Sequence, residues 1–357
     1  MLSYSLALSQ KGFHLGFLVI ISLIEGFYKG MDKVRSTDTD LSDQSLTSIN
    51  EGDDDLLGAA TKDPDKSISW TRAIIDRRLR RITPAIQTAP SRLHQAMSHT
   101  LLMPGKRYRP LLTVLVSQAY GVDNASVYDV ACTAELVHVA SLILDDLPCM
   151  DDAELRRNAP CTHTHFDEST AILAATALLN LAYGIIAEAK DLTAEQRIKL
   201  CRLLSFHVGS NGLIAGQMMD LMNTESTASI KTVETLNRLK TGALLSYSVE
   251  AACVVASVPP EEHTHLAAFA NEVGLAYQLM DDVMDQHSTQ EEAQKDRGQD
   301  AGKSTILNIR GLPYVRKKVG AHIDAAKDSL KKAGLGTDMR LALLLDRQFA
   351  VSQEMQI

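Results

Sequence analysis

Two clusters of aspartates are the residues of this chain best suited to chemistry. One is DDLPCMDD, from Asp145 to Asp152, and the other is DDVMD, from Asp281 to Asp285. Carboxylates this close raise each other's pKa unless a cation lies between them. Hard divalent cations prefer oxygen ligands, and Mg2+ usually binds a few carboxylates together with a substrate phosphate. We therefore expect one metal-assisted site built from two helices that are far apart in the sequence.

The spacing within each cluster indicates how its carboxylates are presented. Asp281 and Asp285 are four residues apart, so they share one face of a helix. Asp145 and Asp151 are six residues apart, but Pro148 should bend or end the helix and let Asp151 turn back. A single Asp-Asp pair is most often a solvated helix end. Two such clusters, each following an apolar helix, favour a binding site.

Basic residues accompany the acidic clusters. The first cluster is flanked by PGKRYRP, from Pro104 to Pro110, and by Arg156-Arg157. Arginine recognises phosphate through a planar fork of donors and lysine as a point charge. Alone, the basic segment would fit a nuclear signal or a surface patch. Together with the carboxylates, it predicts two diphosphate pockets, one using metal and the other bare cations.

These residues need a scaffold, and the sequence predicts an all-α one. The composition is 45% hydrophobic and 5% aromatic, with few β-branched runs, which favours helices. Apolar residues at helical spacing predict seven helices, over 70–82, 101–120, 127–147, 169–189, 196–222, 233–256 and 263–285. Several are apolar nearly all round, which is typical of a bundle with a buried central pair.

Charge, cysteines and the N-terminal segment narrow the class of protein. The net charge is -8, so no nucleic-acid partner is expected. The five cysteines show no CxxC spacing and are interpreted as free thiols in the cytoplasm. Residues 1–66 are interpreted as a leader and a disordered linker, and residues 67–357 as the functional domain. The apolar part of the leader is too short to span a bilayer; organelle targeting and membrane contact stay open.

Six motifs in order give the chain a family resemblance. They are GKRYRP, ELVHVASLILDDLPCMDDAELRR, GQMMD, LKTGALL, YQLMDDVMD and QDAGKST. The set resembles the trans-isoprenyl diphosphate synthases, and most of all the bacterial geranylgeranyl diphosphate synthases of carotenoid pathways. The resemblance runs from about Ile75 to the C-terminus. Asn158 stands where the family usually has glycine.

The resemblance implies a fold and a set of ligands. The fold would be an isoprenoid-synthase-type helical bundle around a central cavity, as a homodimer. Two to three Mg2+ ions, with Mn2+ as a substitute, would bind Asp145, Asp151, Asp281 and Asp285, with Asp146 and Asp282 as further ligands. The allylic diphosphate would meet Arg156, Lys240, Thr241, Gln278 and Lys303. Isopentenyl diphosphate would meet Lys106, Arg109, His138 and Arg157. Lys295 would also bind substrate, and a loop from Lys295 to Lys303 would close the cavity.

The reaction implied is a prenyl transfer. Metal and cations stabilise the departing diphosphate, and the double bond of isopentenyl diphosphate attacks the allylic cation. Asp145, Asp151, Asp281, Lys240 and Lys303 would carry this chemistry. Small residues at Ala140 and Ser141, about one turn before Asp145, would leave room for a C20 product, with Met218 and Met219 as a floor; the alternative is ordinary packing.

Three other functions compete with geranylgeranyl diphosphate synthesis from C5, C10 and C15 primers. A farnesyl diphosphate synthase would share all the chemistry. A non-catalytic partner subunit would have lost an acidic motif or the basic anchors, and this chain keeps them. A terpene cyclase would lack the set Lys106, Arg109 and His138.

Overall fold

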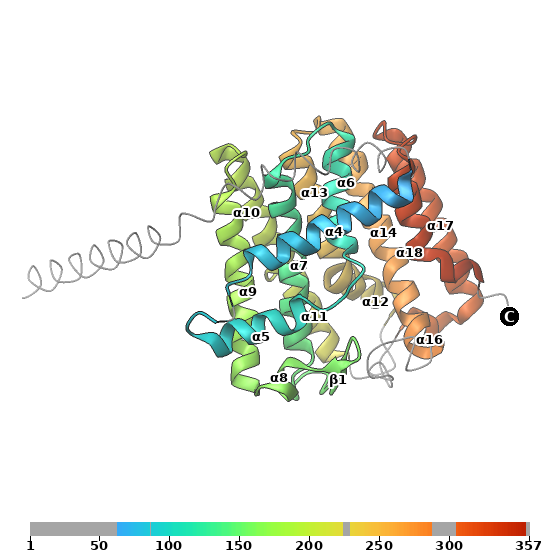
Figure 1. The fold of residues 1–357 in the computed structure, drawn as a ribbon. Helices are drawn as coiled ribbons and strands as arrows, with labels where there is room; N and C mark the ends of the chain where they lie inside the picture. The colour runs from blue at the N-terminus through green and yellow to red at the C-terminus, as the bar shows by residue number, and fades with distance from the viewer. Residues whose placement is uncertain (1–62, 86, 224–228, 288–304, 355–357) are drawn as a thin grey trace, which may run out of the picture. The chain divides into compact units, whose positions relative to one another are not determined.

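Nearly all of the described chain is helical, as the computed structural model shows (Figure 1). The structure describes residues 63–85, 87–223, 229–287 and 305–354. The helices are α4 (Pro64–Ile82), α5 (Ser91–Leu101), α6 (Tyr108–Ala119), α7 (Ala125–Asp145), α8 (Thr162–His165), α9 (Glu168–Glu188), α10 (Ala194–Val208), α11 (Leu213–Met222), α12 (Ile230–Asn237), the π-helical turn η2 (Arg238–Gly242), α13 (Ala243–Val255), α14 (Pro260–His287), α16 (Ile306–Arg310), α17 (Leu312–Lys332) and α18 (Met339–Glu354). The predicted all-α class is confirmed.

The helices begin and end where local chemistry requires. The Asp63 side chain caps α4, which starts at Pro64 rather than at the predicted residue 70. The same helix ends at Ile82, two residues before Pro84, because proline cannot continue it. Thr193 and Gln196 form the predicted capping box of α10, and Pro260 is the first residue of α14, as expected. Residues 63–357 form one compact unit, of which the first helix is α4.

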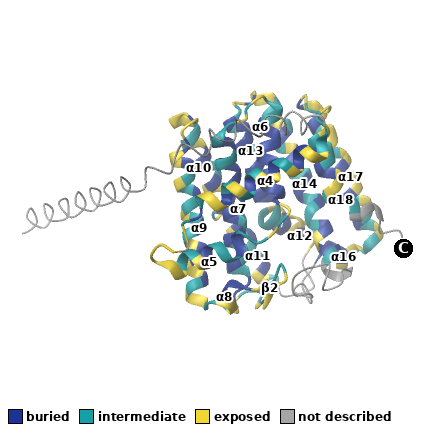
Figure 2. Cartoon of the chain, viewed as in Figure 1, coloured by how far each residue is buried: buried dark blue, intermediate teal, exposed yellow. Residues whose placement is uncertain are grey.

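The centre of the bundle is made by α6, α7 and α13. Every residue of α7 from Val130 to Val137 is buried, and α13 is buried along most of its length (Figure 2). This confirms the expected buried central helices. By length and composition alone, α7 and α9 could each cross a membrane. For α7 the burial supplies the reason, since a core helix of a soluble bundle is apolar on all sides.

Two of the predicted helices are interrupted in the structure. The segment 101–120 becomes helical only at Tyr108, because Arg107 takes a left-handed backbone conformation (φ 50°). The segment 196–222 is two helices, α10 and α11, separated at Gly209–Gly212. A Cβ on Gly212 would lie 1.9 Å from the His207 carbonyl oxygen, so this turn requires glycine.

Other features were not predicted at all. Helix α5 lies in a stretch for which no helix was expected. The segment 233–256 is helical throughout but contains the π turn η2. A short hairpin joins β1 (Leu155–Arg156) to β2 (Ala159–Pro160), with Leu155 opposite Pro160 and Arg156 opposite Ala159. Its two-residue strands are too short for an alternating pattern to be visible in the sequence.

Candidate active site

The first acidic cluster folds back on itself at the end of α7. The helix ends at Asp145, and Asp146 follows as its C-cap. The Asp151 backbone N–H donates to the Asp145 carbonyl at 2.9 Å, and the Met150 N–H donates to the Leu147 carbonyl at 2.8 Å. The predicted turn is therefore present, and it brings the Asp151 and Asp145 backbones together.

The surroundings of Asp145 destabilise its charged form. Burial, aided by the neighbouring Asp151 and opposed by Lys240, raises the pKa of Asp145 to about 6. Lys240 donates to Asp220 at 2.6 Å. Burial works against the charge of Lys240, but Asp145 and Asp220 hold its pKa above the ordinary value. The ammonium group of Lys240 is thus surrounded by several carboxylates. Further positive charge bound in this region would be stabilised electrostatically.

The second acidic cluster is joined to η2 by a short hydrogen-bond chain. Thr241 Oγ1 donates to Gln278 Oε1 at 2.5 Å, and Gln278 Nε2 donates to Asp282 Oδ1 at 2.9 Å. Asp282 is buried, whereas Asp281 is exposed. Lys240 and Thr241 are adjacent, so η2 places one charge near the first cluster and links the next residue, through Gln278, to the second cluster. The sequence predicted both as ligands of one substrate, but not this bridge.

Glycines allow η2 to approach its neighbours closely. A Cβ on Gly216 of α11 would lie 2.2 Å from the Lys240 backbone nitrogen, and a Cβ on Gly274 of α14 would lie 3.0 Å from Gly242 Cα. No side chain fits at Gly216, which explains the first residue of the GQMMD motif. The last residue of this motif, Asp220, is the hydrogen-bond partner of Lys240. The sequence analysis used the motif for the family resemblance but gave Asp220 no role in the site.

The hairpin β1–β2 separates the two arginines that follow the first cluster. Arg156 binds Asp146 with both ends of its guanidinium, with distances of 2.5 to 2.9 Å. Arg157 and Asn158 form the turn, both with positive φ (53° and 61°), as in a type I′ hairpin turn. Asn is the residue after Gly that best tolerates this conformation, so Asn158 maintains the turn. Arg156 therefore anchors the cluster, and Arg157 points elsewhere.

Arg157 belongs to a second, cationic group built on Arg107. The Arg107 guanidinium is buried and binds Glu135 at 2.5 Å, Asp76 at 2.7 Å and the Met103 carbonyl at 2.7 Å. Glu135 also lies 3.8 Å from Arg157. Neither Arg107 nor Glu135 was predicted to matter. Their ion pair holds the loop before α6. It thereby fixes the positions of Lys106, just before Arg107, and of Arg109, two residues after it.

The remaining donors in this group have no strong partner. In the described part of the chain, Nε of the buried Arg109 has no hydrogen-bond acceptor. Its guanidinium lies over the Tyr277 ring at 5.6 Å. Burial, then Arg109 and Arg157, lower the pKa of His138 well below its ordinary value, so the imidazole is neutral at pH 7. Lys106 is exposed. Among the described residues, the carboxylate near the cationic group of Lys106, Arg109, His138 and Arg157 is Glu135, which lies 3.8 Å from Arg157 and is already bound by Arg107.

Several predicted residues cannot be placed by these contacts. Lys295 and Lys303 lie outside the described residues, as does the side chain of Asp285, whose backbone is in α14. Ala140 has no exposed surface, whereas Ser141 is half-buried and donates to the His138 carbonyl at 2.8 Å. Met218 is 57% exposed, which is more than a residue on the floor of a closed cavity would be.

The donor set fits a hard cation bound together with its substrate. Among the described residues, no three His, Cys, Asp or Glu side chains are close enough to hold a metal by themselves. The carboxylates of Asp145, Asp151 and Asp281 supply the oxygen ligands that Mg2+ prefers, and Mg2+ commonly takes one or two carboxylates plus substrate phosphates. The raised pKa of Asp145 also indicates that added positive charge would be stabilised here.

Comparison with known proteins agrees with this arrangement. The Polyprenyl synthetase family matches residues 90–332, more than half of the chain. The chain belongs to the polyprenyl synthetase family. It is 40% identical over 269 residues to a geranylgeranyl diphosphate synthase of Pseudescherichia vulneris, covering 75% of this chain and 86% of that one. It is 37% identical over 248 residues to a farnesyl diphosphate synthase of Geobacillus stearothermophilus, covering 68% and 84%.

A solved structure of the same family shows a similar fold. A geranyltransferase from Helicobacter pylori, complexed with magnesium and isoprenyl diphosphate, superposes with a TM-score of 0.69 at 27% identity. The match covers 80% of this chain and 95% of that chain. The resemblance inferred from the six motifs and the isoprenoid-synthase-type fold are both confirmed.

Proposed function

We propose that this polyprenyl synthetase is a Mg2+-dependent geranylgeranyl diphosphate synthase, which condenses isopentenyl diphosphate with C5, C10 and C15 allylic diphosphates. The observation that carries the proposal is the pairing of two unlike anion sites. One is rich in carboxylates around Lys240, and the other is the cationic group around Arg109 and His138. An enzyme that joins two diphosphates needs one pocket for each.

Isopentenyl diphosphate is assigned to the cationic group. The unpartnered Nε of Arg109 would donate to a phosphate oxygen, and the guanidinium of Arg157 and the ammonium of Lys106 would share the charge. His138 is neutral and donates one hydrogen bond without adding charge. Tyr277 restrains the Arg109 plane through its ring, since cations pack favourably on aromatic faces.

The allylic diphosphate is assigned to the carboxylate side. Mg2+ bound by Asp145, Asp151, Asp281 and Asp285, in two to three ions, would supply Lewis-acid stabilisation of the departing diphosphate. Asp146 is engaged by Arg156 and Asp282 by Gln278, so these two orient the clusters more than they bind metal directly. Lys240 would stabilise charge on the leaving group, and Thr241 would position it.

The carbon chemistry needs positioning and the exclusion of water. The double bond of isopentenyl diphosphate attacks the allylic cation, and a proton is lost to the released diphosphate. No side-chain nucleophile is required. Water near the cation would quench it, so we assign closure of the cavity to the loop from Lys295 to Lys303.

The C20 product follows from the small residues before the first cluster. Ser141 keeps accessible surface one turn before Asp145, whereas Ala140 is fully packed, so Ser141 is the better candidate for contact with the growing chain. The farnesyl product is the second candidate, because the Geobacillus stearothermophilus relative is similar over nearly the same length. The non-catalytic partner subunit is a third.

A homodimer would cover the apolar face that one chain leaves exposed. Large apolar side chains are exposed on α9, α10 and α11, and they are Ile172, Leu173, Ile198, Phe206, Ile214, Met218, Leu221 and Met222. Exposed large apolar side chains that gather into one patch mark an interface. The apolarity of α9 is then explained by a second copy of the chain, and we propose a cytoplasmic enzyme.

The test uses purified full-length protein with Mg2+, labelled isopentenyl diphosphate and each allylic primer. Products are dephosphorylated and sized by chromatography, with a parallel reaction in EDTA. A C20 alcohol that requires Mg2+, or Mn2+ in its place, supports the proposal. A C15 alcohol would establish the farnesyl alternative. Well-folded protein that condenses no primer would contradict the enzyme and favour the partner subunit.

A further inference from the structure

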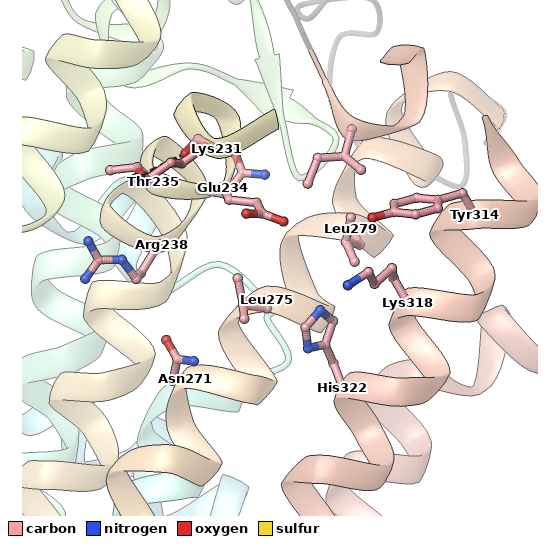
Figure 3. A pocket seen from close by; sticks show the side chains of 12 residues that line it. Lys231, Glu234, Thr235, Arg238, Asn271, Leu275, Leu279, Tyr314, Lys318 and His322 are labelled. Atoms are coloured by element: carbon pink, nitrogen blue, oxygen red, sulfur yellow. Dashed lines mark hydrogen bonds between the residues drawn. The ribbon is translucent and has the colours of Figure 1, made fainter. Parts of the chain in front are cut away.

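A second pocket lies between α12, α14, α16 and α17, and none of the predicted site residues lines it (Figure 3). Its volume is about 280 Å3, at the small end of the range for ligand sites. Leu275, Leu279 and Ile306 give it an apolar side. Tyr314, Lys318 and His322 of α17 point across it toward α12 and α14.

The charged residues of this pocket favour an anion. The cations Lys231, Arg238 and Lys318 line it together with one carboxylate, that of Glu234. In the described part of the chain, no carboxylate oxygen lies within 4 Å of any of these three cationic groups; Lys318 instead lies over the Tyr314 ring at 5.9 Å. Figure 3 shows the Lys318 ammonium pointing into the pocket, whereas the Arg238 guanidinium points away from α17. Lysine without a carboxylate partner is suited to phosphate recognition as a point charge.

Asn237 adds an amide to the lining of the pocket. It is only 6% exposed as a residue, and a carboxamide offers both a donor and an acceptor. A bound phosphate ester or hydroxyl group could therefore form a hydrogen bond with it.

We propose that this pocket binds a small organic phosphate, with its phosphate on Lys318 and Lys231 and a short apolar group on Leu275 and Leu279. The volume suits a molecule of the size of a C5 diphosphate and is too small for a C20 chain. The proposed function enters only in the choice of the C5 diphosphates as the probe. The site is separate from the active site.

Helix α14 contributes residues both to the pocket and to the candidate active site. Leu275 precedes Tyr277 by two residues and Leu279 precedes Asp281 by two, a rotation of roughly 200° around the helix, so the pocket faces away from Tyr277 and Asp281. Gln278 and Asp282 follow Leu275 and Leu279 by three residues and lie next to the pocket face. At its other wall, α12 runs directly into η2. A ligand in the pocket would fix α12 against α14 and so change how Lys240 and Asp281 are held.

Binding is tested by calorimetry in EDTA on a Lys106→Ala/Arg109→Ala chain, which lacks the proposed substrate pocket. We expect one isopentenyl diphosphate to bind per chain, at least fivefold more tightly than inorganic diphosphate. Adding Lys318→Glu should weaken binding at least tenfold. Lys317→Glu, exposed on the same helix and outside the pocket, should not.

Three results would overturn the proposal: no binding by the folded double variant, equal binding after Lys318→Glu and Lys317→Glu, or equal affinity for inorganic diphosphate. Hydrogen exchange on the unmodified chain gives a second readout, since ligand should protect residues 231–238 and 314–322. Prenyl transfer is assayed separately. Its absence in the unmodified chain would sink the proposed function and leave the binding result intact.

Discussion

Gly216→Ala should disable the enzyme by displacing η2. The added Cβ would lie 2.2 Å from the Lys240 nitrogen and 2.6 Å from Lys240 Cα, whereas ordinary contact begins near 3.4 Å. Both clashing atoms belong to the backbone, so no flexible side chain can yield. The backbones of α11 and η2 must therefore separate by about 1 Å.

The effect on activity should be larger than the effect on folding. A misplacement of about 1 Å costs roughly 100-fold in rate when it moves positioning groups, and here it moves both Lys240 and Thr241. Overpacking costs about 1 to 3 kcal/mol in stability, which a helical bundle of this size tolerates. We expect kcat to fall about 100-fold while the protein remains folded.

The assay is steady-state prenyl transfer at saturating Mg2+, with thermal unfolding followed in parallel. Gly320→Ala on α17 is the matched control, because a Cβ there meets nothing within 4 Å; it should keep full activity and gain up to ~1 kcal/mol in stability. A Gly216→Ala enzyme with kcat within threefold of the unmodified chain and unchanged melting would refute the reasoning.

Three further predictions concern Asp146, Asn158 and His138. Asp146→Asn breaks the buried pair with Arg156 and should lower the unfolding free energy by roughly 3 kcal/mol in urea titrations; Asp346→Asn, in a half-exposed pair with Lys327, should cost under ~1 kcal/mol, and equal losses would contradict this. Asn158→Val places a β-branched residue at φ 61° and should lower the melting temperature, whereas Asn158→Gly should not; the reverse order would rule out the hairpin turn. Because burial and the nearby arginines lower the pKa of His138, its contribution is complete above about pH 6.5 and is lost as the pH falls, when the unfolded chain takes up the proton. The melting temperature of His138→Gln relative to the unmodified chain should therefore rise between pH 7.5 and 5, and a constant difference would argue against a neutral His138.

The sequence predicted the helical class and the acidic clusters because both are local patterns. The long apolar run of α7 and the four-residue spacing of Asp281 and Asp285 are visible without any tertiary contact. The turn after Asp145 followed from Pro148, since the steric effect of proline is also local. The predicted anion ligands Arg109 and Arg157 likewise came from residue type and motif.

What the sequence could not show depends on contacts between distant segments. Glu135 pairs with Arg107, 28 residues away. Nothing in the sequence alone distinguishes this buried glutamate from one on the protein surface. Asp220 reaches Lys240 only because Gly216 permits close packing. The π turn leaves no periodic signature, because it changes the helix by a single residue. Arg156 was predicted to bind substrate, yet its guanidinium is occupied by Asp146.

The π turn also has a genetic consequence. A π turn holds one residue more than an α-helical turn, and α12, η2 and α13 otherwise form one continuous helix. Loss of one codon between Arg238 and Gly242 would restore a plain α-helix whose two halves keep their phase, but it would rotate the residues inside the turn by roughly 100°. Lys240 could then not meet Asp220 while Thr241 meets Gln278. An in-frame deletion of three nucleotides would thus yield a folded, inactive copy, a direct evolutionary route from a synthase to a partner subunit without catalysis.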